Sequence, residues 1–309
     1  MRIAIRAAVV VLLGLVPMGY AQTADSAQQA AGKLEFDVAS VRQNKAEGKP
    51  GSNIPLGPQN IYGPSGGVVS AKDFTLLYYM TFAYKLTDYQ QEELRSKAPG
   101  WVLNDRFNIE ARTDDRDVTK DELRRMMQSL LADRFKLAVH YEPRTVSVYA
   151  LKLVKPGVTG AKLKAHPSNA VCPGFSPLVK TAEGKPIASL PDAAADGFPT
   201  FCGGLLDVPA SAQDRYSFGA RDVTMGLMAS ALSSWGNLGR PVVDATGLGG
   251  TWDFVVDYTP DPRPKYATVD SGGPTFREAL QKQLGLKLEA KKAPVPFMVL
   301  DHVERLTQN

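Results

Sequence analysis

Histidine, cysteine and recognised catalytic motifs are scarce in this sequence. Its 309 residues include three histidines and two cysteines, and no histidine or second cysteine lies at metal-ligand spacing beside either cysteine. The chain also contains no S-x-x-K pair and no glycine-rich phosphate-binding loop that opens a helix. The sequence therefore predicts neither a metal nor a cofactor, and it shows no sign of the common metal-dependent hydrolases.

No run of apolar residues is long enough to cross a bilayer, which takes roughly 20 residues. The longest, Ala7–Val16, follows the basic Arg2 and Arg6 and precedes the small-residue sequence Gly19–Ala21. Basic, apolar and small residues in this order are typical of a secretory signal peptide. We therefore expect cleavage before Gln22, and a mature protein exported to the periplasm or the exterior without a membrane span.

Charge of one sign is not in excess either. The formal net charge of the whole chain is +4, and two of the basic residues, Arg2 and Arg6, belong to the predicted signal. The nearly balanced mature chain does not predict a nucleic-acid-binding surface. Hydrophobic residues make up 44% of the sequence, which is enough for one large or two medium hydrophobic cores.

The clearest pattern in the chain runs from Val118 to Val154. Thr119 and Glu122 form a capping box, which predicts a helix start. Apolar residues then recur at helical spacing, namely Leu123, Met126, Met127, Leu130 and Leu131. From Phe135 to Tyr141 the apolar period changes to two, and the alternation stops at Glu142–Arg144 before it resumes. The pattern predicts a helix followed by a β-hairpin.

A similar pattern lies near the C-terminus. Thr275 and Glu278 form a second capping box, and Gly285 is placed to end the helix that follows. Leu286–Leu288 matches Phe135–Leu137 at an offset of 151 residues. This match is the first sign of an internal duplication.

An upstream pair of segments supports the duplication. Ala71–Thr75 matches Ala220–Thr224 at an offset of 149 residues, and we expect Asp73 and Asp222 to cap the helices that follow. Three segments in the same order at nearly one offset indicate two homologous halves. The predicted fold class is α+β, with helices packed in each half on a mixed or antiparallel β-sheet.

These patterns divide the chain into five parts. The predicted organisation is a signal peptide (1–21), a mobile lead (22–34), a first α+β half (35–154), a Pro/Gly-rich linker with a disulfide (155–216) and a second α+β half (217–309). In the second half, Gly247–Gly250 reads as a tight turn in a hairpin that ends with Trp252–Val256.

Both cysteines, Cys172 and Cys202, lie in the predicted linker. An even number of cysteines in an exported protein predicts a disulfide. It would close a loop of about thirty residues and stabilise the fold by roughly 3 to 4 kcal/mol on the chain-entropy estimate. Two unpaired surface thiols are the less expected alternative.

Several long stretches carry a family resemblance. They are Phe36–Arg42, Leu131–Leu137, Gly239–Leu248, Gln283–Glu289, Lys292–Val295 and Asp301–Glu304. With them, the sequence resembles a family of uncharacterised exported proteins that are abundant in soil bacteria and are defined by a domain of unknown function. The resemblance covers nearly the whole expected mature chain.

What the resemblance implies is limited, because the family has no established activity and supplies no catalytic residues. Similar domains are attached in some proteins to membrane-embedded zinc peptidases of the β-lactam-sensor type, which implies a sensing or binding role. The present chain lacks their His-Glu-x-x-His motif, so peptidase activity is not implied. The repeated strand–helix–strand pattern also resembles small periplasmic modules of secretins and TonB-dependent receptors, at the level of fold alone.

Two functional hypotheses follow from the candidate residues. The first is a non-catalytic binding, sensing or assembly module that engages a protein, peptide or glycan of the envelope or exterior, with Tyr62, Tyr89 and Trp101 as candidate binding residues. The alternative is a hydrolase with an unrecognised active site that uses His302 and a carboxylate such as Asp301. Adjacent strand residues point to opposite faces, which weakens a direct Asp301–His302 pair. A purely structural envelope protein is a third possibility.

Overall fold

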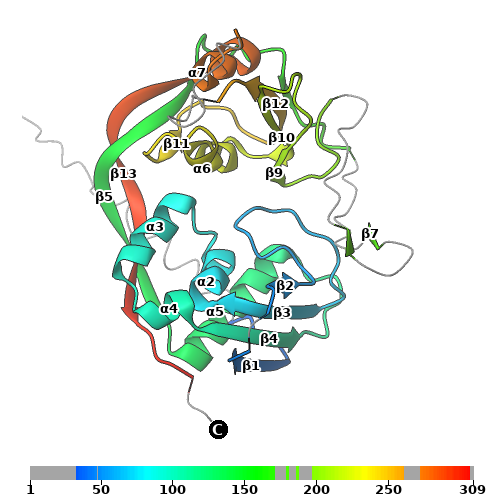
Figure 1. Cartoon of the computed structure of the whole chain (residues 1–309), viewed down its shortest axis with the longest axis vertical. Coiled ribbons are helices and arrows are strands. Elements are labelled where there is room, and N and C mark those ends of the chain that lie inside the picture. Colours follow the sequence, from blue (N-terminus) through cyan, green and yellow to red (C-terminus); the bar gives the residue numbers. More distant parts are fainter. Residues whose placement is uncertain are drawn as a thin grey trace, which may run out of the picture. The chain divides into compact units, whose positions relative to one another are not determined.

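The structure, a computed structural model, describes residues 33–46, 48–170, 179–180, 186–187, 197–260 and 272–306. The predicted signal peptide, most of the predicted mobile lead and Cys172 lie outside the described residues. The described residues form an α+β fold with two lobes, each with its own hydrophobic core, and a two-stranded ribbon that contributes side chains to both cores (Figure 1). None of the helices in the described part is long and apolar enough to cross a membrane.

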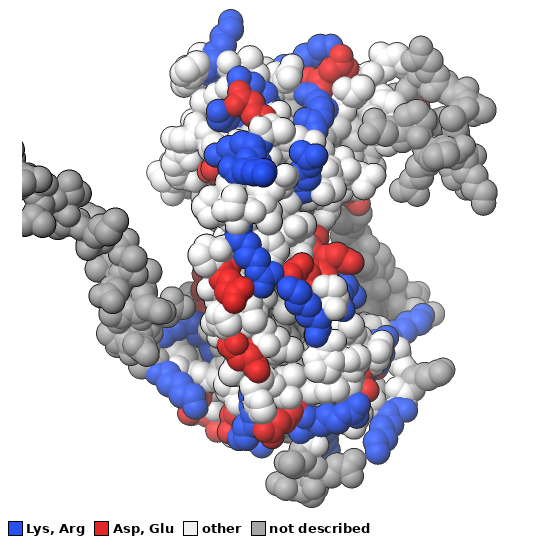
Figure 2. Space-filling model, turned by 90° about the vertical axis from the view of Figure 1, so that its left-hand side faces the viewer, with Lys and Arg blue, Asp and Glu red and all other residues white. Residues whose placement is uncertain are grey.

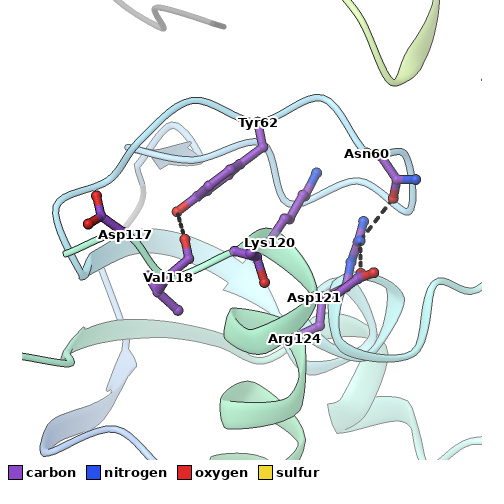
Figure 3. Close-up of a pocket in the computed structure, with 8 residues that line it drawn as sticks. Asn60, Tyr62, Asp117, Val118, Lys120, Asp121 and Arg124 are labelled. Carbon is purple, nitrogen blue, oxygen red and sulfur yellow. Dashed lines mark hydrogen bonds and ion pairs between the residues drawn. The ribbon is translucent and has the colours of Figure 1, made fainter. Parts of the chain in front are cut away.

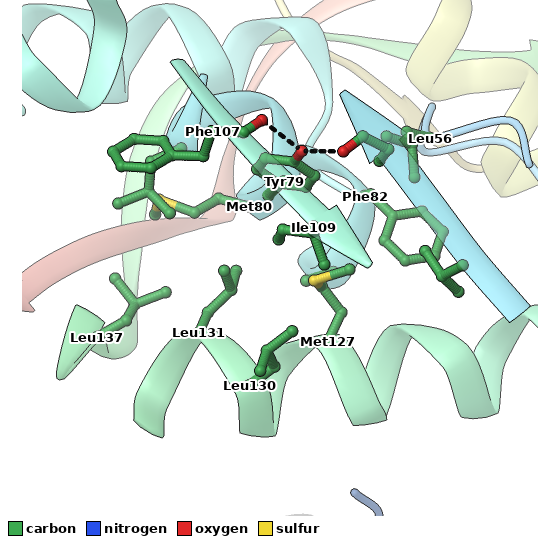
Figure 4. Packing of buried hydrophobic residues seen from close by; sticks show 14 of the residues in the cluster. Leu56, Tyr79, Met80, Phe82, Phe107, Ile109, Met127, Leu130, Leu131 and Leu137 are labelled. Carbon is green, nitrogen blue, oxygen red and sulfur yellow. Dashed lines mark hydrogen bonds between the residues drawn. The ribbon is translucent and has the colours of Figure 1, made fainter. Parts of the chain in front are cut away.

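The first lobe is an antiparallel sheet covered by helices. Its strands lie in the order β1-β4-β3-β2, with β1 at Val38–Asn44, β2 at Gly51–Ser52, β3 at Val68–Thr75 and β4 at Arg106–Arg112. Its helices are α2 (Leu76–Tyr84), α3 (Asp88–Lys97), α4 (Gly100–Asn104) and α5 (Lys120–Phe135). Helix α5 presents the predicted apolar face to the core (Figure 4).

Helix α2 is apolar on nearly every side because it is surrounded by the core of the first lobe. Tyr79 of this helix is fully buried, and its hydroxyl donates to the carbonyl oxygens of Ala71 and Phe107 at 3.2 and 2.9 Å (Figure 4). Burial raises the pKa of Tyr79, so the hydroxyl stays protonated and keeps both hydrogen bonds. These bonds tie α2 to the two central strands of the sheet.

The second lobe has the same strand arrangement. Its strands lie in the order β6-β12-β10-β9, with β6 at Leu163–Ala165, β9 at Gly204–Asp207, β10 at Tyr216–Val223 and β12 at Trp252–Tyr258. Helix α6 spans Met225–Trp235, and α7 (Phe276–Ala279) continues as the π-helix η1 (Leu280–Leu284). Strands β7 (Val179–Lys180) and β8 (Pro186–Ile187) pair only with each other.

Two sequence-based expectations for this lobe are corrected. The predicted linker, 155–216, contributes β6 and β9 to the second sheet; strands of three and four residues are too short to show an alternating pattern. The hairpin predicted around Gly247–Gly250 is not formed, because β11 (Val242–Asp244) pairs in parallel with β5 (Ala138–Leu153), whereas β12 pairs with β10.

The two sheets share an unusual bulge. Asp73 in β3 and Asp222 in β10 both have positive φ angles, 65° and 56°, and both lie where the strand register shifts. The backbone N–H of Asp73 donates to Asn108 Oδ1, and that of Asp222 donates to Asp253 Oδ1, each at 2.9 Å. Aspartate tolerates the left-handed conformation better than most residues, which explains its place in both bulges.

The helices that follow these bulges are capped by threonine. Thr75 Oγ1 accepts the N–H of Tyr78, and Thr224 Oγ1 accepts the N–H of Leu227. The prediction that Asp73 caps α2 and Asp222 caps α6 is therefore wrong. A cap residue needs extended backbone directly before the helix, and the threonines have it while the aspartates lie two residues earlier.

The ribbon consists of β5 and β13 (Leu286–His302), which pair antiparallel along their whole length. The hairpin predicted in residues 135–151 is wrong, because β5 runs straight through Glu142–Arg144. Pro143 lies opposite Pro296, and among the described residues no third strand flanks this part of the ribbon. A proline is tolerated where the N–H it lacks would point away from the partner strand.

Both ribbon strands leave their helices in the same way. Helix α5 ends at Lys136 and η1 ends at Gly285, and both residues are left-handed, with φ of 50° and 70°. They are 149 residues apart, as are Asp73 and Asp222. The C-terminal caps and the bulges therefore share an offset of 149 residues, whereas the capping boxes at Thr119 and Thr275 are 156 residues apart and short identities in the strands suggest 151. Figure 2 shows the side of the molecule on which the ribbon lies, where basic and acidic side chains are interspersed.

Candidate binding site

A charged pocket lies at the start of α5 in the first lobe (Figure 3). It has a volume of about 440 Å³ and is lined by Asn60, Tyr62, Asp117, Val118, Thr119, Lys120, Asp121 and Arg124. Lys120 is buried, and its amino group donates to the carbonyl oxygens of Gln59 and Ile61 at 2.6 and 2.9 Å. The lysine therefore holds the loop that precedes β3.

Burial, followed by the neighbouring charges of Arg124 and Lys85, lowers the pKa of Lys120 to about 7. A neutral lysine amine still has two N–H donors, one for each of the two carbonyl groups it contacts. A buried amine with this pKa is the kind of group that catalytic sites use. Here, however, both of its donors are engaged by the backbone.

Arg124 completes the attachment of the same loop. Its guanidinium donates to the carbonyl oxygens of Pro58 and Gln59 and to Asn60 Oδ1, and it pairs with Asp121 at 2.6 Å. Lys120 and Arg124 also lie over the Phe82 ring, at 6.0 and 5.6 Å from its centroid. Because both cations are committed to protein contacts, the charged pocket is chiefly a device that fixes the loop.

An aromatic pocket lies in the second lobe. It has a volume of about 580 Å³ and is lined by Tyr216, Ser234, Trp235, Gly236, Asn237, Tyr258, Pro260 and Phe276. The four rings pack in contact, with centroids 5.9 Å apart for Tyr216 and Trp235 and 5.0 Å apart for Tyr258 and Phe276. Tyr216 is 38% exposed and Trp235 is half-buried, so ring surface remains open to solvent.

The rings of this pocket are held in place by specific contacts. The Tyr258 hydroxyl donates to the carbonyl oxygen of Trp235 at 2.8 Å, and the Tyr216 hydroxyl donates to Asp207. Burial raises the pKa of Tyr216, and the Asp207 carboxylate raises it further, so this hydroxyl remains a donor. Gly236 leaves room for the Phe276 ring, which a side chain at that position would overlap.

Each pocket includes the start of the helix that precedes a ribbon strand. Thr119 and Thr275 both form capping boxes at the start of the helix that precedes a ribbon strand. The next residue is Lys120 in the first lobe and Phe276 in the second, and both side chains are buried. These two residues share a place relative to the capping box, and they give the two helix starts a different chemistry.

The structure separates the three predicted binding residues. Tyr62 lines the charged pocket, and its hydroxyl donates to the carbonyl oxygen of Val118 at 3.0 Å. Tyr89 packs against Phe297 on the ribbon, at a centroid distance of 5.5 Å. Trp101 stacks on Phe135, at 6.4 Å, and lies under the guanidinium of Arg305. Each of these three aromatic side chains contacts its own neighbours, and the three do not form one site.

His302 and Asp301 point to different partners, as their adjacent positions in a strand predict. His302 Nε2 lies 2.8 Å from Glu304 Oε1, whereas Asp301 Oδ1 lies 2.7 Å from His140 Nδ1. Asp301, followed by Glu142, raises the pKa of His140. His302 and Glu304 are 56% and 54% exposed, and His140 and Asp301 are 48% and 43% exposed, so neither pair has the burial that would favour a hydrolase site near His302.

One serine motif also has the wrong surroundings for catalysis. Gly63–Gly67 fits the letters G-x-S-x-G, and Ser65 Oγ lies 3.2 Å from the Tyr62 hydroxyl. A nucleophile elbow needs a strand before the serine and a helix after it. Here the motif leads into β3, so the serine belongs to a turn before a strand.

Among the described residues, one group has the composition of a metal site. Its donor atoms, from His166, Cys202 and Asp222, lie within 4.8 Å of one another. His166 Nδ1 is also 2.8 Å from Asp253 Oδ1, and both side chains are 6% exposed. Cys202 can act as a ligand only if it does not form the predicted disulfide with Cys172. Because Cys172 lies outside the described residues, this disulfide stays a prediction. The three residues are distant in sequence, which is why no spacing signals the group.

Comparison with known proteins gives a family and no function. Residues 78–303 match the family described as a protein of unknown function (DUF3738). The match runs from within α2 to the residue after the end of β13, and it includes both pockets' helices and the whole ribbon. No curated protein and no solved structure matches the chain.

Proposed function

We propose that this chain, which belongs to the DUF3738 family of proteins of unknown function, is an exported, non-catalytic binding module of the cell envelope. The observation that carries the proposal is the aromatic pocket of the second lobe. Ligand pockets are typically concave and mostly apolar, with a few polar groups that fix orientation. The aromatic pocket combines the faces of four aromatic rings with the polar side chains of Ser234 and Asn237.

The chemistry of the pocket favours a saccharide unit of an envelope glycan. The apolar face of a sugar ring stacks on aromatic rings, and Tyr216 and Trp235 offer such rings at the open side. The exposed Asn237 and Ser234 lie at the same pocket and can bond to sugar hydroxyls. The Ser234 hydroxyl also donates to Asp88 of α3, which connects the pocket to the first lobe.

The order of basic, apolar and small residues in the first 21 positions supports export. Export in turn supports a bond between Cys172 and Cys202. The resemblance to domains attached to membrane peptidases of the β-lactam-sensor type is the basis for a sensing role, in which ligand capture is the signal. The matching sheets, bulges and caps support descent of both lobes from one duplicated unit.

Saccharide binding to the mature protein tests the proposal. A panel of envelope oligosaccharides is titrated by calorimetry, with Trp235→Ala as the test variant and Tyr141→Ala as the control. Tyr141 is exposed on the ribbon and lies outside the pocket lining. We expect at least tenfold weaker binding in Trp235→Ala and no change in the control. A panel without binders, or equal affinity in the two variants, would refute the assignment of the pocket.

A further inference from the structure

Strand β1 leaves one edge of the first sheet open. It pairs with β4 on one side, and among the described residues no strand pairs with its other side. An open edge presents backbone N–H and carbonyl groups that another strand can bond. Sheet edges are used in this way to bind extended peptides.

A groove runs beside this edge, between β1 and the C-terminal part of α5. Its two adjoining cavities have volumes of about 690 and 180 Å³ and share Ala39, Asp133 and Arg134 in their walls. Ala39 and Val41 are half-buried against the first core and give the groove an apolar wall. The groove therefore offers apolar contact as well as backbone bonding.

The larger cavity is strongly basic. Four basic side chains and one acidic side chain line it. Arg134 pairs with the acidic Asp133 at 3.2 Å, whereas Arg42, Lys45 and Lys136 have no ion-pair partner in the described part of the chain. Lys136 caps the C-terminal end of α5, where the helix dipole favours a cation. The helix dipole therefore does not attract an anionic ligand to this end. The attraction for an anion comes from the side chains.

Acidic groups lie at the other end of the groove. The smaller cavity is lined by Glu35 and Asp37 in addition to Asp133. Asp37 Oδ2 accepts the backbone N–H of Asp114 at 2.7 Å. The positive charge is therefore concentrated along the second half of β1, in the larger cavity.

From this arrangement we propose that β1 is a docking edge for an extended, acidic segment of another polypeptide. The segment pairs with β1 as a fifth strand of the first sheet, and its carboxylates face Arg42, Lys45 and Lys136. A strand edge with an apolar wall favours a peptide over a nucleic acid, which would need a broad basic surface. The docking edge is independent of the aromatic pocket, because the two have no residue in common.

Binding of a defined peptide to the mature protein tests the inference. The probe is an eight-residue peptide of alternating valine and glutamate with a fluorescent label, and the comparison peptide has lysine in place of glutamate. The test variant combines Arg42→Glu with Lys136→Glu, and the control is Arg95→Glu, an exposed cation on α3 outside the groove. We expect at least tenfold weaker binding in the double variant, none of the lysine peptide, and no change in the control.

Two further measurements separate strand pairing from simple charge attraction. The same acidic peptide with alternate backbone nitrogens methylated cannot form the ladder, and we expect it to lose at least tenfold in affinity. Amide hydrogen exchange should slow, only when the acidic peptide is present, at the β1 amides that point away from β4. Equal binding of the methylated peptide would overturn the inference, as would slow exchange of these outward amides without peptide, which means that the edge is already occupied. Displacement by an oligonucleotide at the same concentration would overturn it in favour of a nucleic-acid site.

Discussion

The start of the helix before each ribbon strand shows how one framework supports two different sites. In both lobes a threonine forms the capping box, and the residue that follows it is buried. Lys120 in the first lobe bonds two backbone carbonyl groups and fixes a loop, whereas Phe276 in the second lobe forms a wall of an aromatic pocket. The caps and bulges determine the backbone framework of each lobe. The buried residue after the capping box, Lys120 or Phe276, determines the chemistry of the nearby site.

A consequence is that the framework residues and the site residues should respond differently to substitution. Framework leucines at matching positions should matter equally in both lobes, since they occupy the same place in two cores. Substitutions at Lys120 and Phe276 should have different effects. Replacing Lys120 removes hydrogen bonds to the backbone, whereas replacing Phe276 removes part of a binding surface.

The largest effects should come from the two leucines that begin the ribbon strands. Leu137 and Leu286 follow the left-handed caps, and they are 5% and 0% exposed. Replacing either by alanine should lower the free energy of unfolding by roughly 2 to 5 kcal/mol, measured by urea denaturation. Leu288, which is only half-buried, should cost less. A loss below 1 kcal/mol at one of the two matched leucines would contradict the equivalence of the cores.

The predicted disulfide should stabilise the fold, because it cross-links two residues of the unfolded chain that are 30 positions apart, Cys172 and Cys202. Cys202→Ser should lower the free energy of unfolding by about 3 kcal/mol, since the unfolded chain would no longer be cross-linked. Mass spectrometry after alkylation without reductant checks the bond directly. Labelling of both Cys172 and Cys202 in the native protein would show that the bond is absent.

Lys120→Met should have a smaller effect that depends on pH. Loss of the amine removes the donor to the carbonyl group of Ile61 and leaves that of Gln59 with Arg124 alone, at a cost of about 1 to 3 kcal/mol. Because the pKa of Lys120 falls from 10.5 to about 7 on folding, the unfolded chain binds a proton between these pH values that the folded protein does not. The stability of the wild type should therefore rise with pH across this window.

Chemical denaturation at pH 7, 8, 9 and 10 measures this contribution. The deficit of Lys120→Met relative to the wild type should grow with pH, while Lys72→Met, at an exposed lysine on β3, should follow the wild type. If the two variants have the same pH profile, Lys120 is not the group responsible.

Much of the framework could be predicted because its signals are local. The capping box at Thr119 and the apolar period after it predicted the start of α5 and its buried face, and the second box placed the start of α7. Phe135, which the alternating pattern assigns to the next strand, is the last residue of α5. The hairpins were predicted wrongly because Glu142–Arg144 is a strong break signal in isolation. Only the facing Pro296 on a distant strand shows why β5 continues there.

The sites could not be predicted because they depend on contacts between distant segments. The aromatic pocket draws Tyr216, Trp235, Tyr258 and Phe276 from four different elements, and none of these residues stands out from its neighbours in sequence. The bond from Asp222 to Asp253 likewise depends on strand register. Sequence patterns reveal which faces are apolar, but not which polar or aromatic side chains a fold brings together.

The smallest predicted effect concerns two matched ion pairs at the ends of the ribbon. His140 pairs with Asp301 across the strands at 2.7 Å, and Glu289 pairs with Lys152 at 2.6 Å. His140 and Glu289 are 149 residues apart, and so are Lys152 and Asp301. The same place in each lobe thus carries a cross-strand pair, with the positions of acid and base exchanged.

The two pairs should lose their contribution to stability at opposite ends of the pH range. Asp301, followed by Glu142, raises the pKa of His140, so its contribution is complete below the ordinary value near 6.5 and is lost as pH rises through the folded value. Lys152, followed by Lys287, lowers the pKa of Glu289 to about 2, so its contribution is present above the ordinary value and is lost as pH falls toward 2. Asp301→Asn should return the NMR titration midpoint of His140 toward 6.5 and leave that of Glu289 unchanged. If the midpoint of His140 does not move, Glu142 is its main partner, and the exchanged pairs are not equivalent features of the two lobes.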